Sequence, residues 1–196
     1  MKARNTSMIA RTGIMLLMAA AIATGCKKKK EIQDAPAGEE LVTEYCAGPD
    51  YFSNEEFFRS NGLGESMDQA TARKRAMSNA RADLASAIST TVKGTIDNYV
   101  NSREFNNKEE IEERFEGLTR EVINQELNGV KTICQQAVRV TSNGNYKYYV
   151  ALELSGQELL GSMNERLSSD ERLRIDYDYE QFKKTFDQEM ENFSNK

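Results

Sequence analysis

The sequence predicts an α+β domain in which a small antiparallel sheet is packed by one long alanine-rich helix and a second helix. Three patterns lead to this fold class. Apolar residues recur every three or four positions over about 76–99, alternate singly over 146–154, and return to helical spacing after residue 157. The first and third patterns are typical of amphipathic helices, and the second is typical of a strand. Helices and strands that are segregated along the chain favour an α+β fold.

The first strand is expected near residues 57–62, turning into the long helix. Ser66 and Gln69 have the spacing of a capping box, with Ser66 at the N-cap. Because the helix is rich in alanine, we expect it to lie close against the sheet. Its apolar stripe consists of Ala76, Met77, Ala80, Leu84, Ala87, Ile88, Val92, Ile96 and Tyr99. We interpret Gly62 and Gly64 as residues of a tight strand-to-helix turn. A phosphate-binding turn is the alternative, but the third glycine and the lysine of such loops are absent.

A second helix is predicted from Asn107, which would cap it reciprocally with Glu110, to a stop near Gly129. Its apolar positions are Ile111, Phe115, Leu118, Val122 and Leu127. Five glutamates crowd its first half: Glu109, Glu110, Glu112, Glu113 and Glu116. We interpret them as a solvated acidic face, with a hard-cation site or acid–base pair as the alternative.

Residues 133–141 and 146–154 are expected to form a β-hairpin, because an Asn-Gly pair separates two alternating runs. A two-residue turn would place Ala137 opposite Val150 and leave other apolar residues of the first strand on the opposite face. This mismatch leaves two alternatives, a β-bulge or an edge strand with apolar groups on both faces. The hairpin tyrosines are interpreted as packing residues, with a ligand or peptide groove as the alternative; they are Tyr146, Tyr148 and Tyr149.

Residues 157–196 are predicted to be a C-terminal helical extension. Ser168 and Glu171 suggest a further capping box. The apolar stripe of the extension contains Ile175, Tyr179, Phe182, Phe186 and Phe193. Docking on the domain is the expected outcome, and pairing with a second subunit or contact with a membrane are the alternatives.

Residues 1–25 have the layout of a secretory signal peptide, with basic residues followed by an apolar run over 14–23. The run is shorter than the roughly 20 residues that cross a bilayer. It ends in Ile22-Ala23-Thr24-Gly25-Cys26, which resembles the lipobox of bacterial lipoproteins. This resemblance predicts cleavage between Gly25 and Cys26 and lipidation of the Cys26 thiol; an ordinary signal peptide is the alternative. Three acyl chains would hold the mature protein at a membrane without spanning it.

Residues 26–44 are predicted to be a lipidated flexible tether, followed by an α+β domain over 45–156. Four lysines, Lys27–Lys30, follow the lipidation site and either contact anionic headgroups or belong to a solvated tether. In lipoproteins generally, aspartate at the position of Lys27 favours retention in the inner membrane. The outer membrane is therefore expected, with the periplasmic face or, alternatively, the cell surface as the location.

Composition argues against several classes of function. The 196-residue chain contains no histidine, which excludes the histidine forms of catalytic triads and zinc sites. After removal of residues 1–25, it would carry 23 basic and 31 acidic side chains, a net charge of −8. Such a surface repels nucleic acid. We therefore expect no enzyme activity, no cofactor or metal, and no nucleic-acid partner.

Two further cysteines, Cys46 and Cys134, lie in the predicted domain. An exported protein meets an oxidising environment in which a disulfide is chemically allowed. The sequence leaves two alternatives open, a bridge between the two residues or two separate buried thiols.

Three segments together are similar to the signature of the LPP-twenty lipoproteins. They are residues 62–70, the Ala80-Arg81-Ala82-Asp83-Leu84-Ala85 run, and Tyr148-Tyr149-Val150-Ala151-Leu152. The resemblance covers about residues 50–155. It implies a small outer-membrane lipoprotein, related in fold to the N-terminal domain of a flagellar outer-ring protein. It also implies one long helix packed across a small sheet, and no catalytic residues.

These observations predict a non-enzymatic, membrane-anchored structural or interaction module of the cell envelope, which forms homo-oligomers or binds an envelope protein. The alternative is a lipoprotein that binds a small ligand or peptidoglycan fragment between helix and sheet.

Overall fold

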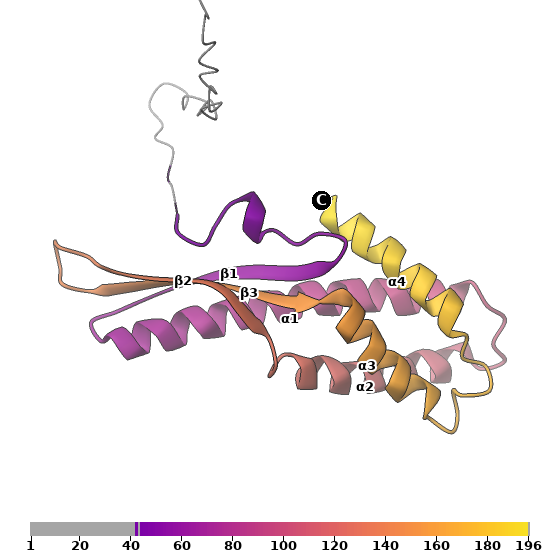
Figure 1. Cartoon of the computed structure of the whole chain (residues 1–196). Helices are drawn as coiled ribbons and strands as arrows, with labels where there is room; N and C mark the ends of the chain where they lie inside the picture. Colours follow the sequence, from indigo (N-terminus) through magenta and orange to yellow (C-terminus); the bar gives the residue numbers. More distant parts are fainter. Residues whose placement is uncertain (1–41, 43, 196) are drawn as a thin grey trace, which may run out of the picture. The chain divides into compact units, whose positions relative to one another are not determined.

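The sheet of this protein has three antiparallel strands, and one long helix lies across one of its faces (Figure 1). The computed structural model describes residues 42 and 44–195; the predicted signal peptide, the lipidation site and most of the tether lie outside them. Strand β3 (Tyr146–Ser155) lies between β1 (Phe57–Ser66) and β2 (Lys131–Arg139). The predicted α+β class, with a small antiparallel sheet and helices, is confirmed.

Helix α1 (Gln69–Asn101) contains the predicted alanine-rich stripe. Seven of its nine members are buried, and Met77 and Ala87 are partly buried. The predicted cap was wrong: the N-cap is Asp68, whose carboxylate accepts hydrogen bonds from the Thr71 hydroxyl at 2.7 Å and the Thr71 N–H at 2.8 Å. These bonds hold the pKa of Asp68 below its usual value. Ser66 is still the last residue of β1, so it does not cap the helix.

Gly62 and Gly64 lie inside β1, and not in a turn after it as the sequence suggested. Both face the backbone of α1. A Cβ atom at Gly62 would lie 2.7 Å from the backbone nitrogen of Ala80, closer than side chains approach in real structures. The Ser60 hydroxyl continues this contact by donating a hydrogen bond of 2.7 Å to the Ala80 carbonyl. The two glycines therefore allow the helix to touch the strand, and leave no space there for a phosphate.

The β2–β3 hairpin has a wider loop than the two-residue turn that the Asn-Gly pair suggested. The Val140 N–H donates to the Asn145 carbonyl at 2.7 Å, which leaves a loop of residues 141–144. Gly144 occupies the left-handed region with a φ of 76°. As a result, Ala137 pairs with Tyr148.

Strand β2 combines the two features that the sequence left as alternatives. Its register shifts between Thr132 and Cys134, which makes Ile133 the extra residue of a β-bulge. It is also an edge strand with apolar side chains on both faces, because Ala137 shares a face with Tyr148 whereas Val138 lies on the other.

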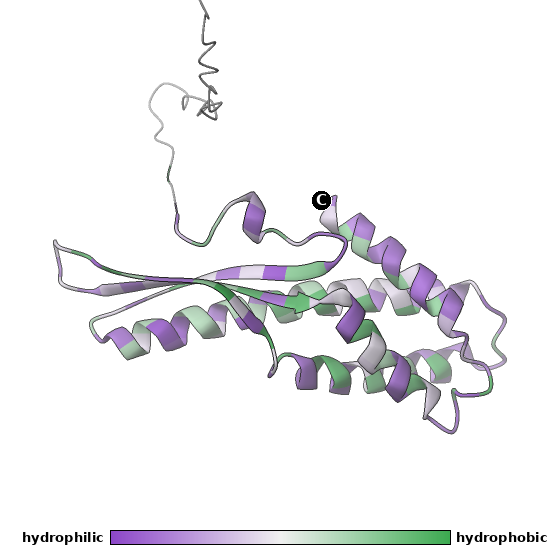
Figure 2. Cartoon of the chain, in the orientation of Figure 1, coloured by the Kyte–Doolittle hydropathy of each residue, from purple (hydrophilic) through white to green (hydrophobic). Residues whose placement is uncertain are grey.

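Helices α2 (Lys108–Glu126), α3 (Gly156–Ser168) and α4 (Tyr179–Ser194) gather around the half of α1 that is distant from the hairpin loop (Figure 1). Hydrophobic and hydrophilic residues alternate along α2 and α4, as expected of helices with one buried side (Figure 2). Asn107 precedes α2 as predicted, but its side chain accepts no capping hydrogen bond; its amide donates to Glu110 at 3.3 Å instead.

The C-terminal extension packs on its own domain. Phe182, Phe186 and Met190 of α4 are fully buried, and the Phe182 ring lies 5.3 Å from that of Tyr99 on α1. Ile175 differs from the prediction: it lies in the connection between α3 and α4 and is 81% exposed.

No helix begins at the predicted capping box around Ser168, where α3 ends. Asp170 instead stabilises the connection between α3 and α4. Its buried carboxylate accepts hydrogen bonds from the Nε of Arg114 at 3.0 Å and from the backbone N–H groups of Arg172 and Leu173. The hydrogen bond from Arg114 lowers the pKa of Asp170 despite its burial.

Candidate functional site

Residues 44–56, which we call the strap, run over the face of the sheet opposite α1 and contain a short 3-10 helix, η1 (Pro49–Tyr51) (Figure 1). Successive side chains of a strand point to opposite faces. Odd-numbered residues of β1 and β3 therefore face the strap, whereas even-numbered residues face α1.

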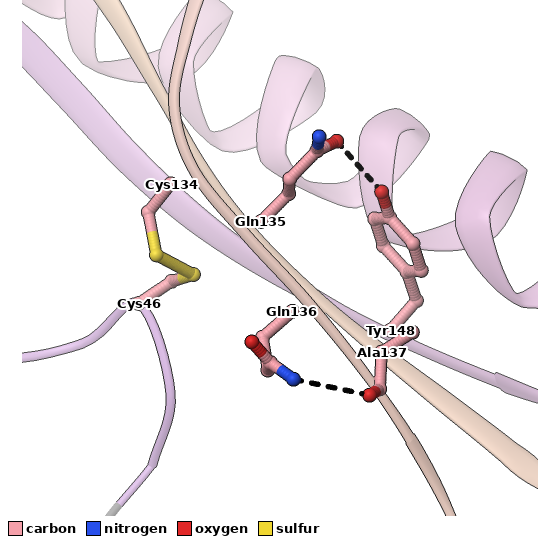
Figure 3. The surroundings of a disulfide bond; sticks show 6 residues. All are labelled: Cys46, Cys134, Gln135, Gln136, Ala137 and Tyr148. Carbon is pink, nitrogen blue, oxygen red and sulfur yellow. Dashed lines mark hydrogen bonds between the residues drawn. A yellow bond between two sulfur atoms is a disulfide. The ribbon is translucent and has the colours of Figure 1, made fainter.

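A disulfide bond between Cys46 and Cys134 ties the strap to β2 (Figure 3). The two Cα atoms are 5.5 Å apart, and Cys46 is buried. Cys134 pairs with Ala151 of β3, which places its side chain on the strap-facing side of the sheet. Of the two alternatives left by the sequence, the structure contains the bridge. It connects residues 88 positions apart, so it restricts a large part of the unfolded chain.

The strap also supplies hydrogen-bond partners for backbone groups at the outer edge of β1. The Ser53 hydroxyl accepts from the Arg59 N–H at 2.8 Å and donates to the Arg59 carbonyl at 3.0 Å. On the same face of the sheet, Arg59 of β1 forms an ion pair with Glu153 of β3. The Nε of Arg59 lies 2.8 Å from the Glu153 carboxylate, and both side chains are less than one-fifth exposed. Local sequence patterns give no signal for this ion pair, because it requires the register between β1 and β3.

Helix α1 covers the next part of the same edge. The Arg75 guanidinium donates to the Glu65 carbonyl at 2.6 Å, and the Asn79 amide donates to the Leu63 carbonyl at 2.9 Å. Such coverage blocks the addition of another strand.

The outer edge of β2 is different. Backbone groups of Gln135, Ala137 and Arg139 point away from β3 because of the alternating ladder. Within the described part of the chain, the only hydrogen bond to them is from the side-chain amide of Gln136 to the Ala137 carbonyl, at 3.2 Å. Among the described residues, no strand pairs with this edge.

A groove of about 370 Å³ opens beside β1, between the strap and α1. Tyr45 and Tyr149 form an edge-to-face pair on one side, with ring centroids 5.5 Å apart, and Leu63 lies beside them. Asn79 and Asp83 of α1 line the opposite side. Aromatic faces near a carboxylate suit polar or cationic groups of a ligand.

The three hairpin tyrosines do not line one groove, because the pleat separates them. The Tyr148 ring faces α1, and its hydroxyl donates to Gln135 at 2.7 Å (Figure 3). The Tyr146 ring is covered by Arg139, whose guanidinium carbon is 5.9 Å from the ring centroid. Only Tyr149 faces the strap.

Two glutamates of the predicted acidic face of α2 approach α1. Carboxylate oxygens of Glu112, Glu116 and Asp97 lie within 4.8 Å of one another. One Asp97 oxygen is buried with no hydrogen-bond partner among the described residues. The Lys93 ammonium lies 3.5 Å from Glu116 and offsets part of the negative charge. Sequence analysis did not identify Asp97, because it lies on α1 and the glutamates lie on α2, so no local spacing relates them.

Gly25 and Cys26, the predicted cleavage and lipidation residues, lie outside the described residues, as do Lys27–Lys30. Among the helices described, none combines the length and apolar character that crossing a bilayer requires. Comparison of the chain with protein-family models, with curated proteins and with solved structures found no match.

Proposed function

We propose that this chain is a non-enzymatic lipoprotein of the bacterial cell envelope, of the LPP-twenty kind, anchored through Cys26. It would present its α+β domain at the periplasmic face of the outer membrane, with the cell surface as the alternative. The lipobox carries this proposal: small residues precede Cys26 at the end of a short apolar run that follows basic residues.

The attachment of the strap supports an anchored role. A pull on the N-terminal tether would enter the domain through the strap and reach Cys46 ahead of the sheet. From there the disulfide passes the load to β2. The Ser53 hydrogen bonds to Arg59, and a hydrogen bond of 3.2 Å from the Arg59 guanidinium to the Phe52 carbonyl, hold the strap against β1. Such a connection resists peeling of the strap more than noncovalent packing alone.

Intact-mass spectrometry of protein purified from its native membrane tests the anchor. The expected mature species begins at Cys26 and carries the added mass of a diacylglycerol and an acyl chain. Cys26→Ser should lose this mass and leave the membrane fraction. A matched Cys46→Ser/Cys134→Ser variant should keep it. An unlipidated wild-type protein would overturn the proposal.

We place protein contacts at the open edge of β2, because its outward backbone groups suit the addition of a strand from a second copy or another envelope protein. Light scattering of residues 27–196 over a range of concentrations tests self-association. If copies pair there, Ala137→Pro should abolish the larger species, because proline removes the outward N–H, whereas Ala137→Ser should keep it. Wild-type monomers at every concentration would exclude a second copy as the partner.

The groove beside β1 favours a second candidate function, the binding of a small polar ligand or peptidoglycan fragment. Packing between α1 and the sheet is too close for a ligand, so the groove at their margin replaces the expected position. Calorimetric titration with soluble peptidoglycan fragments should show binding that Asp83→Asn weakens and Asp187→Asn, far from the groove, leaves unchanged. Absence of heat at millimolar fragment concentrations would exclude this function.

A further inference from the structure

Charge is distributed unevenly over the domain. We define the sheet tip as residues 61–83 and 138–150, which comprise the hairpin loop with adjoining strand residues, the end of β1 and the first turns of α1 (Figure 1). It carries six basic and three acidic side chains, a net charge of +3. The other described residues carry 12 basic and 24 acidic side chains, a net charge of −12. The basic residues of the tip are Arg73, Lys74, Arg75, Arg81, Arg139 and Lys147.

The tip cations differ from the other cations in their pairing. Among the described residues, only Lys147 of the tip forms an ion pair, with Glu65 at 4.0 Å. Of the eight ion pairs between described residues, seven lie outside the tip. Arg73 and Arg139 lie over the rings of Tyr148 and Tyr146, which orients the guanidinium groups without neutralising them. Because none of the tip's arginines forms an ion pair among the described residues, their charges are available to an anionic surface.

The sheet tip also contains an exposed apolar side chain. Met67, in the turn between β1 and α1, is 85% exposed, more than any other described large hydrophobic residue. Its flexible thioether suits the boundary between headgroups and acyl chains, with basic residues at the headgroup level.

We propose that the sheet tip docks on anionic lipid headgroups of the membrane that carries the anchor. This inference rests on the proposed lipidation of Cys26. The backbone from Cys26 to Val42 spans at most about 55 Å, so an anchored domain stays close to the membrane at a high effective concentration. The same surface repels the acidic remainder of the domain, which turns the end with α2, α3 and α4 away from the membrane.

The test compares two exposed positions at opposite ends of the domain in the full lipidated protein. Met67→Cys and Ile175→Cys replace side chains that are 85% and 81% exposed. Each variant is reconstituted in vesicles of neutral phosphatidylcholine, or of phosphatidylcholine with about one-third phosphatidylglycerol. The rate of reaction with a membrane-impermeant maleimide is then measured. We expect labelling at residue 67 to slow at least threefold on the anionic vesicles and labelling at residue 175 to stay unchanged. High salt should remove the difference, because it screens exposed charges.

Matched charge variants identify the surface. R73Q/K74Q/R81Q should restore fast labelling at residue 67, whereas R120Q/R174Q/K184Q removes three exposed cations outside the tip and should leave the labelling slow. Equal effects of the two variants, or equal labelling on both vesicles, would overturn the docking while leaving the anchor intact. Failure of the wild type to incorporate into vesicles would overturn the anchor and the docking with it. Protection of residue 67 by polyglutamate but not by anionic vesicles would assign the tip to an acidic protein and also overturn membrane docking.

Discussion

The two faces of the sheet are covered in different ways. On one face, α1 lies on β1 through glycine and alanine, and its stripe buries Leu84 and Ile88 completely. On the other face, the strap is held by a disulfide, by hydrogen bonds of Ser53 and Phe52 with Arg59, and by one pair of aromatic rings. A partly buried ion pair between β1 and β3 lies on the same face. The first face depends on close packing over a long helix. The second depends on a few specific contacts, so each of them contributes a large share of its stability.

Removal of the disulfide should have the largest effect on stability. Cys46→Ala/Cys134→Ala should lower the free energy of unfolding by about 4 kcal/mol, because a bridge across a loop of this length mainly restricts the unfolded chain. Urea unfolding measures the change. Limited proteolysis should also cut the double variant first within residues 44–56. A loss below about 1 kcal/mol would show that the strap is held mainly by its other contacts.

Gly64→Ala tests the α1 face by adding a single methyl group. Its Cβ would lie 2.5 Å from the backbone nitrogen of Ala76, so the helix must shift, and we expect a loss of about 3 kcal/mol in unfolding free energy. Gly117→Ala is the matched control, since that position in α2 has no heavy atom within 4 Å. The control should gain about 0.5–1 kcal/mol from helix propensity. Similar thermal shifts in the two variants would contradict the close contact between α1 and β1.

The two faces also differ in how well the sequence predicted them. The α1 stripe was predicted because 3.6-residue periodicity is a local signal, and Tyr99, Leu84 and Ile88 are buried as expected. The glycines were assigned to a turn, because a Gly-x-Gly pattern does not reveal which residue ends the strand. Ser66 and Asp68 are both good caps, and only the true end of β1 decides between them.

The strap face was predicted far less well, because its contacts join residues distant in sequence. The Cys46–Cys134 bridge stayed one of two alternatives, since its formation depends on a distance across 88 positions. The Arg59–Glu153 pair depends on strand register. The lipid site Cys26 is the reverse case: a local motif predicts it, and it lies outside the described residues.

Glu153→Gln should have an intermediate effect on the strap face. It leaves the Arg59 guanidinium partly buried without a counter-charge, so we expect a loss of about 2 kcal/mol in unfolding free energy. Arg166→Gln breaks a more exposed ion pair with Glu121 and should cost less than about 0.5 kcal/mol. Chemical unfolding at low and high salt separates the two pairs, because salt screens the exposed one more strongly. Equal losses of unfolding free energy in the two variants would contradict a larger contribution from the more buried ion pair.

On the strap face, the smallest expected effect belongs to Tyr45, which is 55% exposed and forms an edge-to-face pair with Tyr149 at a centroid distance of 5.5 Å. A double-mutant cycle with Tyr45→Ala and Tyr149→Ala should give a coupling energy of about 1 kcal/mol. The cycle must separate two sources of the contact, because Tyr45 is the direct neighbour of Cys46 and the disulfide alone can hold the rings together. Repeating the cycle in the Cys46→Ala/Cys134→Ala background distinguishes these cases. A coupling that persists without the bridge makes the aromatic pair an independent contact of the strap, whereas a coupling that vanishes makes the disulfide the sole organiser of this end of the strap.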